Sequence, residues 1–595
     1  MIRGVSLMVA ALAIGPACLH VLADSPAEQA AAARKRLTAW HGEQPESGER
    51  LLHIIAWRSS DRGFAENHRQ RLDRMLTDIQ SFYRRELQRH GLAPGTIRLD
   101  RDTTGQLIIH EVTGAGRWAD YGRSDGSRIR AECLPVLRQQ GIDINRETIM
   151  IFTNLASWDP LNGRFQHKSP FYAGGDWRRG TAWQLDSPEL DTLNLPLLEP
   201  MIEDGEYGRI TLGKHNSIFI GGIAHELGHA LGLPHCRARR DEERQGTALM
   251  GSGNRTYGDE RRNEGKGTFL TLAHALRLAS HPQFTKSIKG IAVTPKGEFS
   301  DLSIVARNDG KSFTVRGRAD CQPPVYAVIG YLDPEGGGDY DSRTVTAVPD
   351  GQGRFELECD AVVPGRSASL RLVACHVNGS TTKRTFPYSV EPSGRVDVRT
   401  ARALLALDPF LDRLHVAGPA AAKQQIPADE WAASLAAAVL EGRSDRRKTI
   451  DPQATNPDVT ILPLSQAAPV TAQVGWRQPA YDNLPQRDAL VEAAGQLYET
   501  GIYAHAPAVH AYALGGKWRR LRGACGLPSR QGGSVVFVIL SDGREVFRSP
   551  KLQPGRIADY DVDLTDVTSL ELRTENAGDG NNGDWGVWLA PMLSR

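Results

Sequence analysis

The chain has 595 residues, more than one compact domain usually holds, so several domains are expected. Its 71 lysines and arginines nearly balance its 70 aspartates and glutamates, which leaves a formal net charge of +1. This balance argues against a nucleic acid or an anionic membrane as a partner, because neither a basic excess nor an acidic tail is present.

The first 23 residues have the pattern of an export signal. Arg3 gives a positive start, an apolar run extends from Val5 to about Ala17, and the small-residue stretch 21–23 suits a signal peptidase. The apolar run is too short and interrupted to span a membrane, and no other segment has the required length and apolarity. We therefore predict a secreted, periplasmic or cell-surface protein. A lipoprotein signal with Cys18 as the lipidated residue is the less favoured alternative.

Cysteine usage fits an exported chain. Six of its seven cysteines remain if Cys18 is removed with the signal. An even number of cysteines in an exported chain permits disulfides, although their connectivity cannot be derived from the sequence. Three of them fall within one predicted β-sandwich, which favours one disulfide and one unpaired cysteine there. Apart from Cys18, the cysteines are Cys133, Cys236, Cys321, Cys359, Cys375 and Cys525.

The N-terminal part alternates predicted strands with predicted helices. Residues 24–50 are polar and alanine-rich and are expected to form a leader helix and linker. Strands are expected at 51–57, 107–112 and 148–154, and helices at 64–91, at 127–140 and from Asn216 or Ser217 onward. This alternation predicts an α+β domain over residues 51–285.

The remainder is predicted to form three further segments. Short alternating runs separated by Gly, Asp and Pro turns predict an Ig-like β-sandwich over 286–392. An Ala/Leu-rich helical segment and linker follow over 393–457, and residues 458–595 are again rich in strands. We expect the β-sandwich and the helical segment to act as spacers.

The sequence HELGHALGLPH, residues 225–235, carries the clearest chemical signal. On a helix His225 and His229 lie one turn apart and present two imidazoles on one face, with Glu226 beside the first. Gly232 can adopt the positive φ that ends a helix, and the chain then presents His235 as a third ligand. Three protein nitrogens leave one coordination position for water, which is typical of a catalytic zinc site.

The pattern HExxHxxGxxH resembles that of the metzincin metallopeptidases, and its wording is most similar to the matrixin branch. The resemblance implies one catalytic Zn²⁺ held by the three histidines, with Glu226 as general base in peptide hydrolysis. It also implies that Met250 in TALMGSGN forms the methionine turn beneath the metal. The chain departs from matrixins in having no cysteine-switch peptide and in reading GSGNRTYG after the methionine.

Roles can also be predicted for a tyrosine, a cysteine and two histidines outside the ligand set. Tyr257 is a candidate oxyanion stabiliser, although its offset from Met250 does not match the families that use such a tyrosine. Cys236 directly follows the third ligand and is expected to belong to the scaffold. Isolated histidines such as His110 and His215 are expected to pack or cap.

The last 135 residues resemble the NPCBM family of carbohydrate-binding modules, which implies a C-terminal jelly-roll β-sandwich. The motifs that carry this resemblance are Gly501, His505-Ala506, Leu514-Gly515-Gly516, Ser541-Asp542-Gly543 and Asp584-Trp585. A sugar site needs aromatic rings for stacking and polar side chains for hydroxyls, and the candidates are Tyr503, His505, Asp584, Trp585 and Trp588. An alternative use of Asp579, Asn581 and Asp584 is to bind Ca²⁺.

Together these patterns predict a multidomain, exported zinc endopeptidase that acts on protein or glycoprotein substrates and binds carbohydrate through its C-terminal module. Two alternatives remain open at this stage. One is a glycan-binding adhesin with structural zinc. The other is a glycoside hydrolase, although no segment of the sequence indicates the pair of facing carboxylates that such an enzyme needs.

Overall fold

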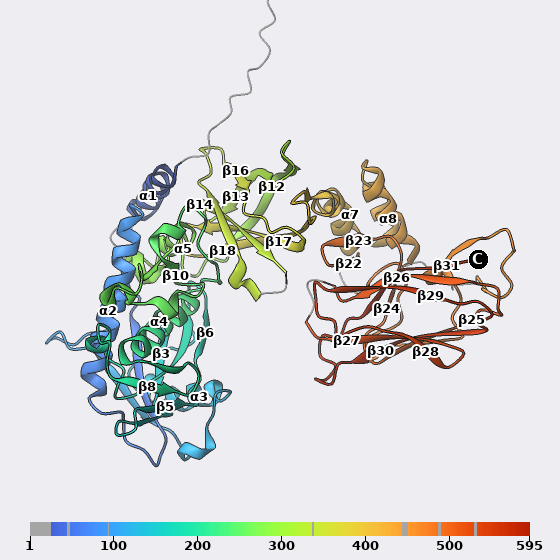
Figure 1. Ribbon diagram of the computed structural model, residues 1–595. Helices are drawn as coiled ribbons and strands as arrows, with labels where there is room; N and C mark the ends of the chain where they lie inside the picture. Colours follow the sequence, from blue (N-terminus) through green and yellow to red (C-terminus); the bar gives the residue numbers. More distant parts are fainter. Residues whose placement is uncertain are drawn as a thin grey trace, which may run out of the picture.

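The computed structural model describes residues 25–43, 48–92, 95–335, 338–442, 450–485, 490–528 and 532–595. The predicted signal peptide, residues 1–23 with Cys18, lies outside the described residues. No helix within these ranges combines the length and apolarity that crossing a membrane requires. The chain forms two masses: the N-terminal elements together with a β-sandwich, and the C-terminal strands beside a pair of helices (Figure 1).

A five-stranded sheet organises the N-terminal domain. Four of its strands run parallel and the edge strand β6 is antiparallel to β7, in the order β2-β1-β3-β7-β6. The strands are β1 (Leu52–Arg58), β2 (Ile109–Thr113), β3 (Thr148–Thr153), β6 (Tyr172–Gly175) and β7 (Gly180–Leu185). The three strands expected from the sequence are therefore confirmed.

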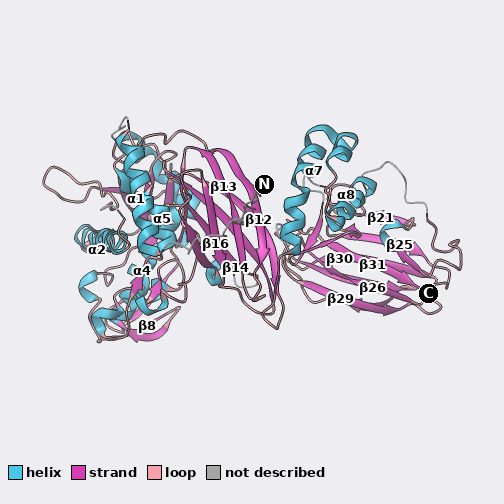
Figure 2. Cartoon of the chain, turned by 90° about the horizontal axis from the view of Figure 1, so that it is seen from above, coloured by secondary structure: helices cyan, strands magenta, loops and turns pink. Residues whose placement is uncertain are grey.

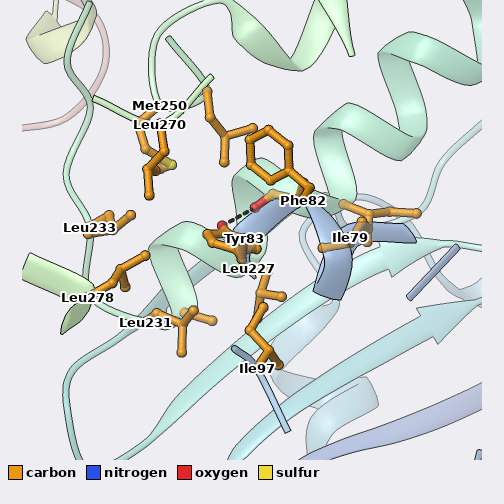
Figure 3. Packing of buried hydrophobic residues seen from close by; sticks show 14 of the residues in the cluster. Ile79, Phe82, Tyr83, Ile97, Leu227, Leu231, Leu233, Met250, Leu270 and Leu278 are labelled. Atoms are coloured by element: carbon orange, nitrogen blue, oxygen red, sulfur yellow. Dashed lines mark hydrogen bonds between the residues drawn. The ribbon is translucent and has the colours of Figure 1, made fainter. Parts of the chain in front are cut away.

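Helices cover both faces of this sheet. Helices α2 (His68–Arg89) and α4 (Leu212–Ala230) share one core with Leu52 and Ile54 of β1. Helix α3 (Gly126–Gln139) packs on the opposite face, against Ile55 and Trp57. Figure 3 shows Leu227 of α4 packed close to Tyr83 of α2 within this cluster.

Helix α4 begins earlier than the sequence predicted. Its N-cap is Thr211, whose hydroxyl accepts a hydrogen bond from the Lys214 backbone N–H at 3.0 Å. Asn216 is buried inside the helix, where its amide donates to the carbonyls of Glu189 and Leu212. The prediction of an N-cap at Asn216 or Ser217 was wrong because Asn216 uses its polar side chain for a tertiary contact.

Smaller elements complete this domain. A four-stranded sheet has the order β4-β5-β8-β9, and β10 pairs with β11. These elements are β4 (Ala156–Asp159), β5 (Arg164–His167), β8 (Met201–Asp204), β9 (Gly208–Thr211), β10 (Thr247–Ala248), β11 (Thr268–Phe269), α5 (Leu272–Ala279) and α6 (Pro282–Thr285).

Helix α1 (Pro26–Gly42) belongs to the core of the protein. Ser25 and Glu28 form a capping box at its start, and Ala30, Ala33 and Leu37 are buried. The prediction of a helix in the leader is confirmed, but residues 26–42 do not form a linker. The alanine-rich composition serves close packing, because small side chains let a helix approach its neighbours.

Residues 296–397 form a sandwich of two antiparallel sheets around one hydrophobic core. One sheet has the order β12-β13-β16 and the other the order β15-β14-β17-β18-β19. The strands are β12 (Lys296–Ala306), β13 (Phe313–Gln322), β14 (Val325–Pro334), β15 (Arg343–Ala347), β16 (Arg354–Cys359), β17 (Arg366–His376), β18 (Thr381–Val390) and β19 (Val396–Asp397). The predicted β-sandwich is confirmed.

This sandwich is not a spacer, because its second sheet is fused to the N-terminal domain. Tyr326, Ile329 and Val373 from β14 and β17 belong to the same buried cluster as helices α1, α4 and α5. Tyr326 also hydrogen-bonds to Leu276 of α5 through its buried hydroxyl. Figure 2 shows the sandwich strands directly against the N-terminal helices. The outer face of this sheet is therefore part of the hydrophobic core of the N-terminal domain, while the sandwich keeps a second core between its own sheets.

All six cysteines of the described residues are free and buried. The predicted disulfide within the sandwich was wrong. Cys321 and Cys359 lie in the core between the two sheets, whereas Cys375 faces the N-terminal domain. They therefore act as small apolar side chains on strands.

Helices α7 (Arg399–Ala422) and α8 (Glu430–Gly442) connect the sandwich to the C-terminal module. Their buried cluster contains Leu407 and Phe410 of α7, Leu435 of α8, and Leu490 and Leu497 of the C-terminal module. A direct contact adds to this link, because the Ser367 hydroxyl donates to the Ala494 carbonyl at 2.7 Å. The helical segment is thus packed between two domains.

The C-terminal module is a second sandwich of two antiparallel sheets around its own core. One sheet has the order β20-β31-β26-β29, with β24 also paired to β31, and the other the order β21-β25-β30-β27-β28. The strands are β20 (Ile461–Pro463), β21 (Thr471–Gln473), β22 (Val491–Ala493), β23 (Gln496–Tyr498), β24 (Gly501–Tyr503), β25 (Ala508–Ala513), β26 (Arg520–Gly526), β27 (Val535–Ser541), β28 (Arg544–Arg548), β29 (Ile557–Asp563), β30 (Ser569–Asn576) and β31 (Val587–Ser594).

Candidate active site

The C-terminal turns of α4 and the loop that follows bring three histidines together. His225 and His229 lie one turn apart on α4. The helix then ends at Gly232, whose φ of +83° is a conformation that other residues rarely adopt. The chain turns back there and carries His235 to the same side. One helix and one glycine turn therefore bring the three histidines to the same place.

The imidazoles meet through their Nε2 atoms. His229 Nε2 lies 3.1 Å from His225 Nε2 and 2.9 Å from His235 Nε2. The opposite nitrogen of each ring is held by an acceptor: His225 Nδ1 by the Leu249 carbonyl at 2.7 Å, and His229 Nδ1 by the Leu233 carbonyl at 2.8 Å. His235 Nδ1 lies 2.6 Å from Asp339 Oδ1. Since each Nδ1 carries the proton, all three Nε2 lone pairs point to one place.

This donor set fits a metal ion. Three neutral imidazole nitrogens at these separations have no proton to share, so a cation is the group that satisfies all of them. Burial lowers the pKa of His225 to about 3 and also lowers the pKa of His229, which keeps both rings in the neutral form that binds metal. The three histidines of the sequence motif therefore form a group that could hold a metal ion.

Glu226 sits between the two helical histidines in sequence and is partly buried. Burial raises the pKa of its carboxyl group to about 8 in the metal-free protein. A carboxyl group in such surroundings can take up and release a proton near neutral pH. A nearby cation would lower this pKa, because it favours the carboxylate form.

Met250 lies beneath the helix that carries the histidines. It is fully buried, and a Cβ atom added to Gly228 would lie 2.4 Å from the Met250 sulfur. The backbone around Met250 is also tied to the ligand loop, since Cys236 N–H donates to the Met250 carbonyl at 3.1 Å. Figure 3 shows Met250 near Leu233 and Leu270. Met250 thus packs against the helix that carries His225 and His229.

The sandwich domain adds two residues to the site. Asp339 and Tyr340 lie in a short 3-10 helix (Gly338–Asp341) between β14 and β15. The Tyr340 ring stacks on His235 with centroids 3.6 Å apart and an angle of 24° between the planes. Arg371 of β17 holds the other oxygen of Asp339 at 3.2 Å. Sequence analysis missed both residues because they lie about a hundred positions from the motif, His235 and Asp339 being 104 residues apart.

Tyr257 does not lie among these residues. Its hydroxyl donates to Asp78 of α2 at 2.6 Å, and its ring is buried against Phe82. Burial raises the pKa of Tyr257 well above its usual value, and the negative charge of Asp78 adds to this effect. The predicted oxyanion role is therefore not supported, because the hydroxyl is directed to a structural partner.

His215 and Cys236 behave as scaffold residues. His215 is fully buried on α4, with Nδ1 2.9 Å from Asp204 and Nε2 3.3 Å from Glu189. Cys236 is buried 3.6 Å from both the Thr271 hydroxyl and His274 Nδ1. Both expectations of a packing role agree with these contacts.

The predicted carbohydrate contacts are only partly brought together. Tyr503, His505 and Trp585 form an aromatic cluster, with the Tyr503 and Trp585 rings 5.2 Å apart. All three are largely buried, and the exposed ring of the cluster is Trp476, 45% exposed and 5.2 Å from Trp585. Sequence analysis missed Trp476. The available signal was a large apolar ring directly after Gly475, in a turn, where the local backbone does not require such a residue.

Two further predictions for this module are corrected. Trp588 is fully buried in the sandwich core against Phe537 and Tyr560, so it cannot contact a sugar. Asp584 is buried and accepts a hydrogen bond from Ser534 N–H at 2.9 Å. Its expected partner in calcium binding, Asp579, is engaged by Ser534 and Lys551. No potential metal cluster of the described residues includes either aspartate.

Comparison with known proteins identifies the C-terminal module. Residues 461–594 match the family described as the NPCBM/NEW2 domain. The chain therefore combines, in its described residues, a candidate metal centre with a module of a carbohydrate-binding family. No curated protein matches the chain.

Solved structures give three similarities of interest. Wild-type OgpA from Akkermansia muciniphila is 25% identical with a TM-score of 0.48, covering 60% of this chain and 97% of that chain. Catalytically inactive OgpA from the same organism, in complex with an O-glycopeptide substrate, is 24% identical with a TM-score of 0.47, covering 58% and 94%. The CBM51 of GH95 from Clostridium perfringens, in complex with methyl-galactose, is 21% identical with a TM-score of 0.21, covering 23% and 100%. These TM-scores lie below 0.5, so the similarities do not by themselves establish a function for this chain.

Proposed function

We propose that this chain is an exported zinc-dependent endopeptidase of the metzincin type that hydrolyses peptide bonds in glycosylated proteins. One observation carries the proposal: three histidine Nε2 atoms converge at the end of α4, the helix that also carries Glu226, and each ring is fixed by an acceptor at Nδ1. A purely structural zinc site usually has four protein ligands, whereas three histidines leave a position open to substrate.

The roles of the residues follow from this arrangement. His225, His229 and His235 would hold Zn²⁺, which when bound supplies a Lewis acid for the scissile carbonyl and for water. Glu226, next to the first ligand on α4, takes the proton from the attacking water and delivers it to the leaving amine, because a nearby cation keeps its side chain in the carboxylate form that accepts a proton. Met250 supports α4 from below and contacts no reacting atom.

The substrate class is inferred from the combination of site and module. A carbohydrate-binding module on the same chain raises the local concentration of glycosylated substrate around the peptidase site. Trp476 offers an exposed ring on which the apolar face of a sugar can stack. Protein substrates that carry glycans would engage both parts of the chain.

The test compares the purified wild-type protein with Glu226→Gln on mucin and on casein, with and without a zinc chelator. We expect wild type to cleave protein, chelation to abolish cleavage and added zinc to restore it. Glu226→Gln should retain zinc but lose at least about 10³-fold in rate, because the proton transfer is lost. Glu203→Gln, an exposed glutamate on β8, serves as the matched control and should cleave normally.

The same assay addresses the two other functions. An adhesin with structural zinc would bind zinc and mucin but leave both proteins intact, and this outcome would reject the peptidase. A glycoside hydrolase would release sugar from mucin at a rate that Glu226→Gln does not change.

A further inference from the structure

We propose a second metal site in the N-terminal domain, formed by His53, Asp100 and His110 on the face of the sheet opposite to α4. One ligand atom from each of these residues lies within 4.8 Å of the others. Apart from the three histidines of the candidate active site, no other group of this kind occurs among the described residues. The proposal is independent of the peptidase function.

The sheet itself places the three side chains together. His53 is the second residue of β1, and the pairing of Ile55 with His110 puts both histidines on one face of two adjacent parallel strands. Asp100 follows Leu99, which forms a bridge with Leu52 at the start of β1. The Ile108 N–H donates to the Asp100 carbonyl at 2.9 Å, which fixes this segment beside β2.

The active-site helix is on the other side of the sheet. Leu52 and Ile54 face α4 within the largest hydrophobic cluster, whereas Ile55 and Trp57 face α3. Because successive residues of a strand point to opposite faces, His53 lies on the α3 side with Ile55. The two groups of ligands are thus separated by the sheet and cannot share one ion.

Two nitrogen atoms in this cluster lack hydrogen-bond partners. His53 Nδ1 and His110 Nε2 are both buried without a donor or acceptor in suitable geometry, and each side chain is more than nine-tenths buried. His53 Nδ1 lies 3.3 Å from Asp100 Oδ2, at ion-pair distance. Buried polar nitrogens without partners are unfavourable and rare in folded proteins, so a bound group at this position explains them.

The chemistry of the donors indicates the kind of ion. Two imidazoles and one carboxylate suit a first-row divalent cation such as Zn²⁺, and a hard cation such as Ca²⁺ would need more oxygen ligands. Burial lowers the pKa of both His53 and His110, which leaves the rings neutral and able to coordinate. Glu147 lies close enough to His53 to influence its pKa. It is not counted among the ligands, because it already forms an ion pair with Arg50 at 2.6 Å.

The position suggests a structural role. β2 is the edge strand of the five-stranded sheet, and β1 is its only neighbour in that sheet among the described strands. An ion shared by β1, β2 and the segment at Asp100 would join three pieces of chain at this edge. The ion would therefore stabilise the domain and leave the peptidase chemistry to the other site.

The experiment counts zinc in the full chain. Protein stripped with a chelator is loaded with Zn²⁺, freed of excess metal by gel filtration and analysed by mass spectrometry for bound zinc. We expect two zinc ions in wild type, one in His110→Gln, one in His229→Gln and none in the double variant. His68→Gln, a histidine on α2 that contacts Glu111 of β2, is the control and should keep both ions.

Stability provides a second readout. In the His229→Gln background, added Zn²⁺ should raise the melting temperature by about 5 °C or more, and His110→Gln should remove this rise. His110 lies on an edge strand, and retention of the active-site zinc by His110→Gln shows that the variant is folded. A zinc count in His110→Gln equal to that of wild type overturns the proposal, whether wild type binds one zinc or two. If His229→Gln lost no zinc while His110→Gln lost one, the proposed peptidase site would fail and the second site would stand.

Discussion

The Nδ1 atom of His235 lies 2.6 Å from the Oδ1 atom of Asp339, so a carboxylate of the sandwich domain holds a histidine of the N-terminal domain. Burial alone would raise the pKa of Asp339, but the hydrogen bonds and charges of His235 and Arg371 hold it well below its usual range. The ionised carboxylate fixes the His235 ring with Nε2 directed to the metal position. Packing between the two domains is therefore part of the site.

Asp339→Asn should weaken zinc binding by about 10–100-fold, since the loss of an outer carboxylate partner typically has this effect on a histidine ligand. Competition with a chromogenic chelator measures the dissociation constant for zinc. Asp320→Asn, at an exposed aspartate of the same sandwich, is the control. Equal zinc affinity in Asp339→Asn and wild type would mean that Asp339 does not position His235.

Tyr340 should affect substrate more than metal. Its ring stacks on His235, yet half of the residue is exposed, so one face is open to a bound peptide. We expect Tyr340→Ala to lower kcat/KM about 10-fold with zinc affinity changed by less than about 3-fold, whereas Tyr340→Phe keeps the ring and most of the activity. A loss in Tyr340→Phe as large as that in Tyr340→Ala would assign the effect to the hydroxyl.

The contact between Gly228 and Met250 should be specific for size. Met250→Ala removes a fully buried side chain and should cost about 2–5 kcal/mol in the free energy of unfolding. Gly228→Ala places a methyl group against the Met250 sulfur and should cost about 1–3 kcal/mol. Because the new methyl group partly fills the space that Met250→Ala leaves, the double variant should lose less than the sum of the two. Urea denaturation of the four proteins measures this coupling, and strict additivity would contradict it.

The sequence predicted the metal ligands because they lie close together in it. His225, His229 and His235 need only one helix and one glycine turn, and these are local properties. Asp339 reaches His235 through the packing of one domain on another, and no local pattern describes that packing. Tyr257 was assigned wrongly for a related reason. Its distance in sequence from Met250 does not determine the direction of its side chain, which points to Asp78.

The apolar sequence of β14 indicates that the β-sandwich packs on another domain, a role that alternation of apolar and polar residues alone does not predict. The segment VYAVIGYL of β14 is apolar at nearly every position, and eight successive residues from Val325 to Leu332 are buried. A strand with one face in solvent alternates, whereas a strand covered on both faces reads as a continuous apolar run. The run therefore indicates that something packs on the outer face of β14. What packs there, the core of helices α1 and α5, could not be derived from the run itself.

Stability should depend on pH through His215. Burial alone would lower the pKa of His215, but hydrogen bonds to Asp204 and Glu189 outweigh it and raise the pKa above 6.5. The charged ring thus contributes stability that is fully present below about pH 6.5 and is lost as the pH rises through the folded-state pKa. The difference in unfolding free energy between metal-free wild type and His215→Gln should therefore shrink as the pH rises above about 6.5. A difference that grows over this range would contradict the assignment of a raised pKa.

Trp476 should carry much of the carbohydrate binding of the C-terminal module. It is the exposed ring of the cluster with Trp585 and His505, and replacing it removes little from the core. We expect Trp476→Ala to weaken retention on immobilised mucin by about 10-fold or more, since stacking and buried ring area both disappear. The Glu226→Gln background prevents digestion of the matrix during the measurement. Val470→Ala changes another exposed apolar residue of the module and should bind mucin normally.

Cleavage of an unglycosylated peptide by Trp476→Ala should equal that of wild type, because the ring belongs to the module and not to the peptidase site. Undiminished retention of Trp476→Ala on mucin would place the sugar site elsewhere on the module.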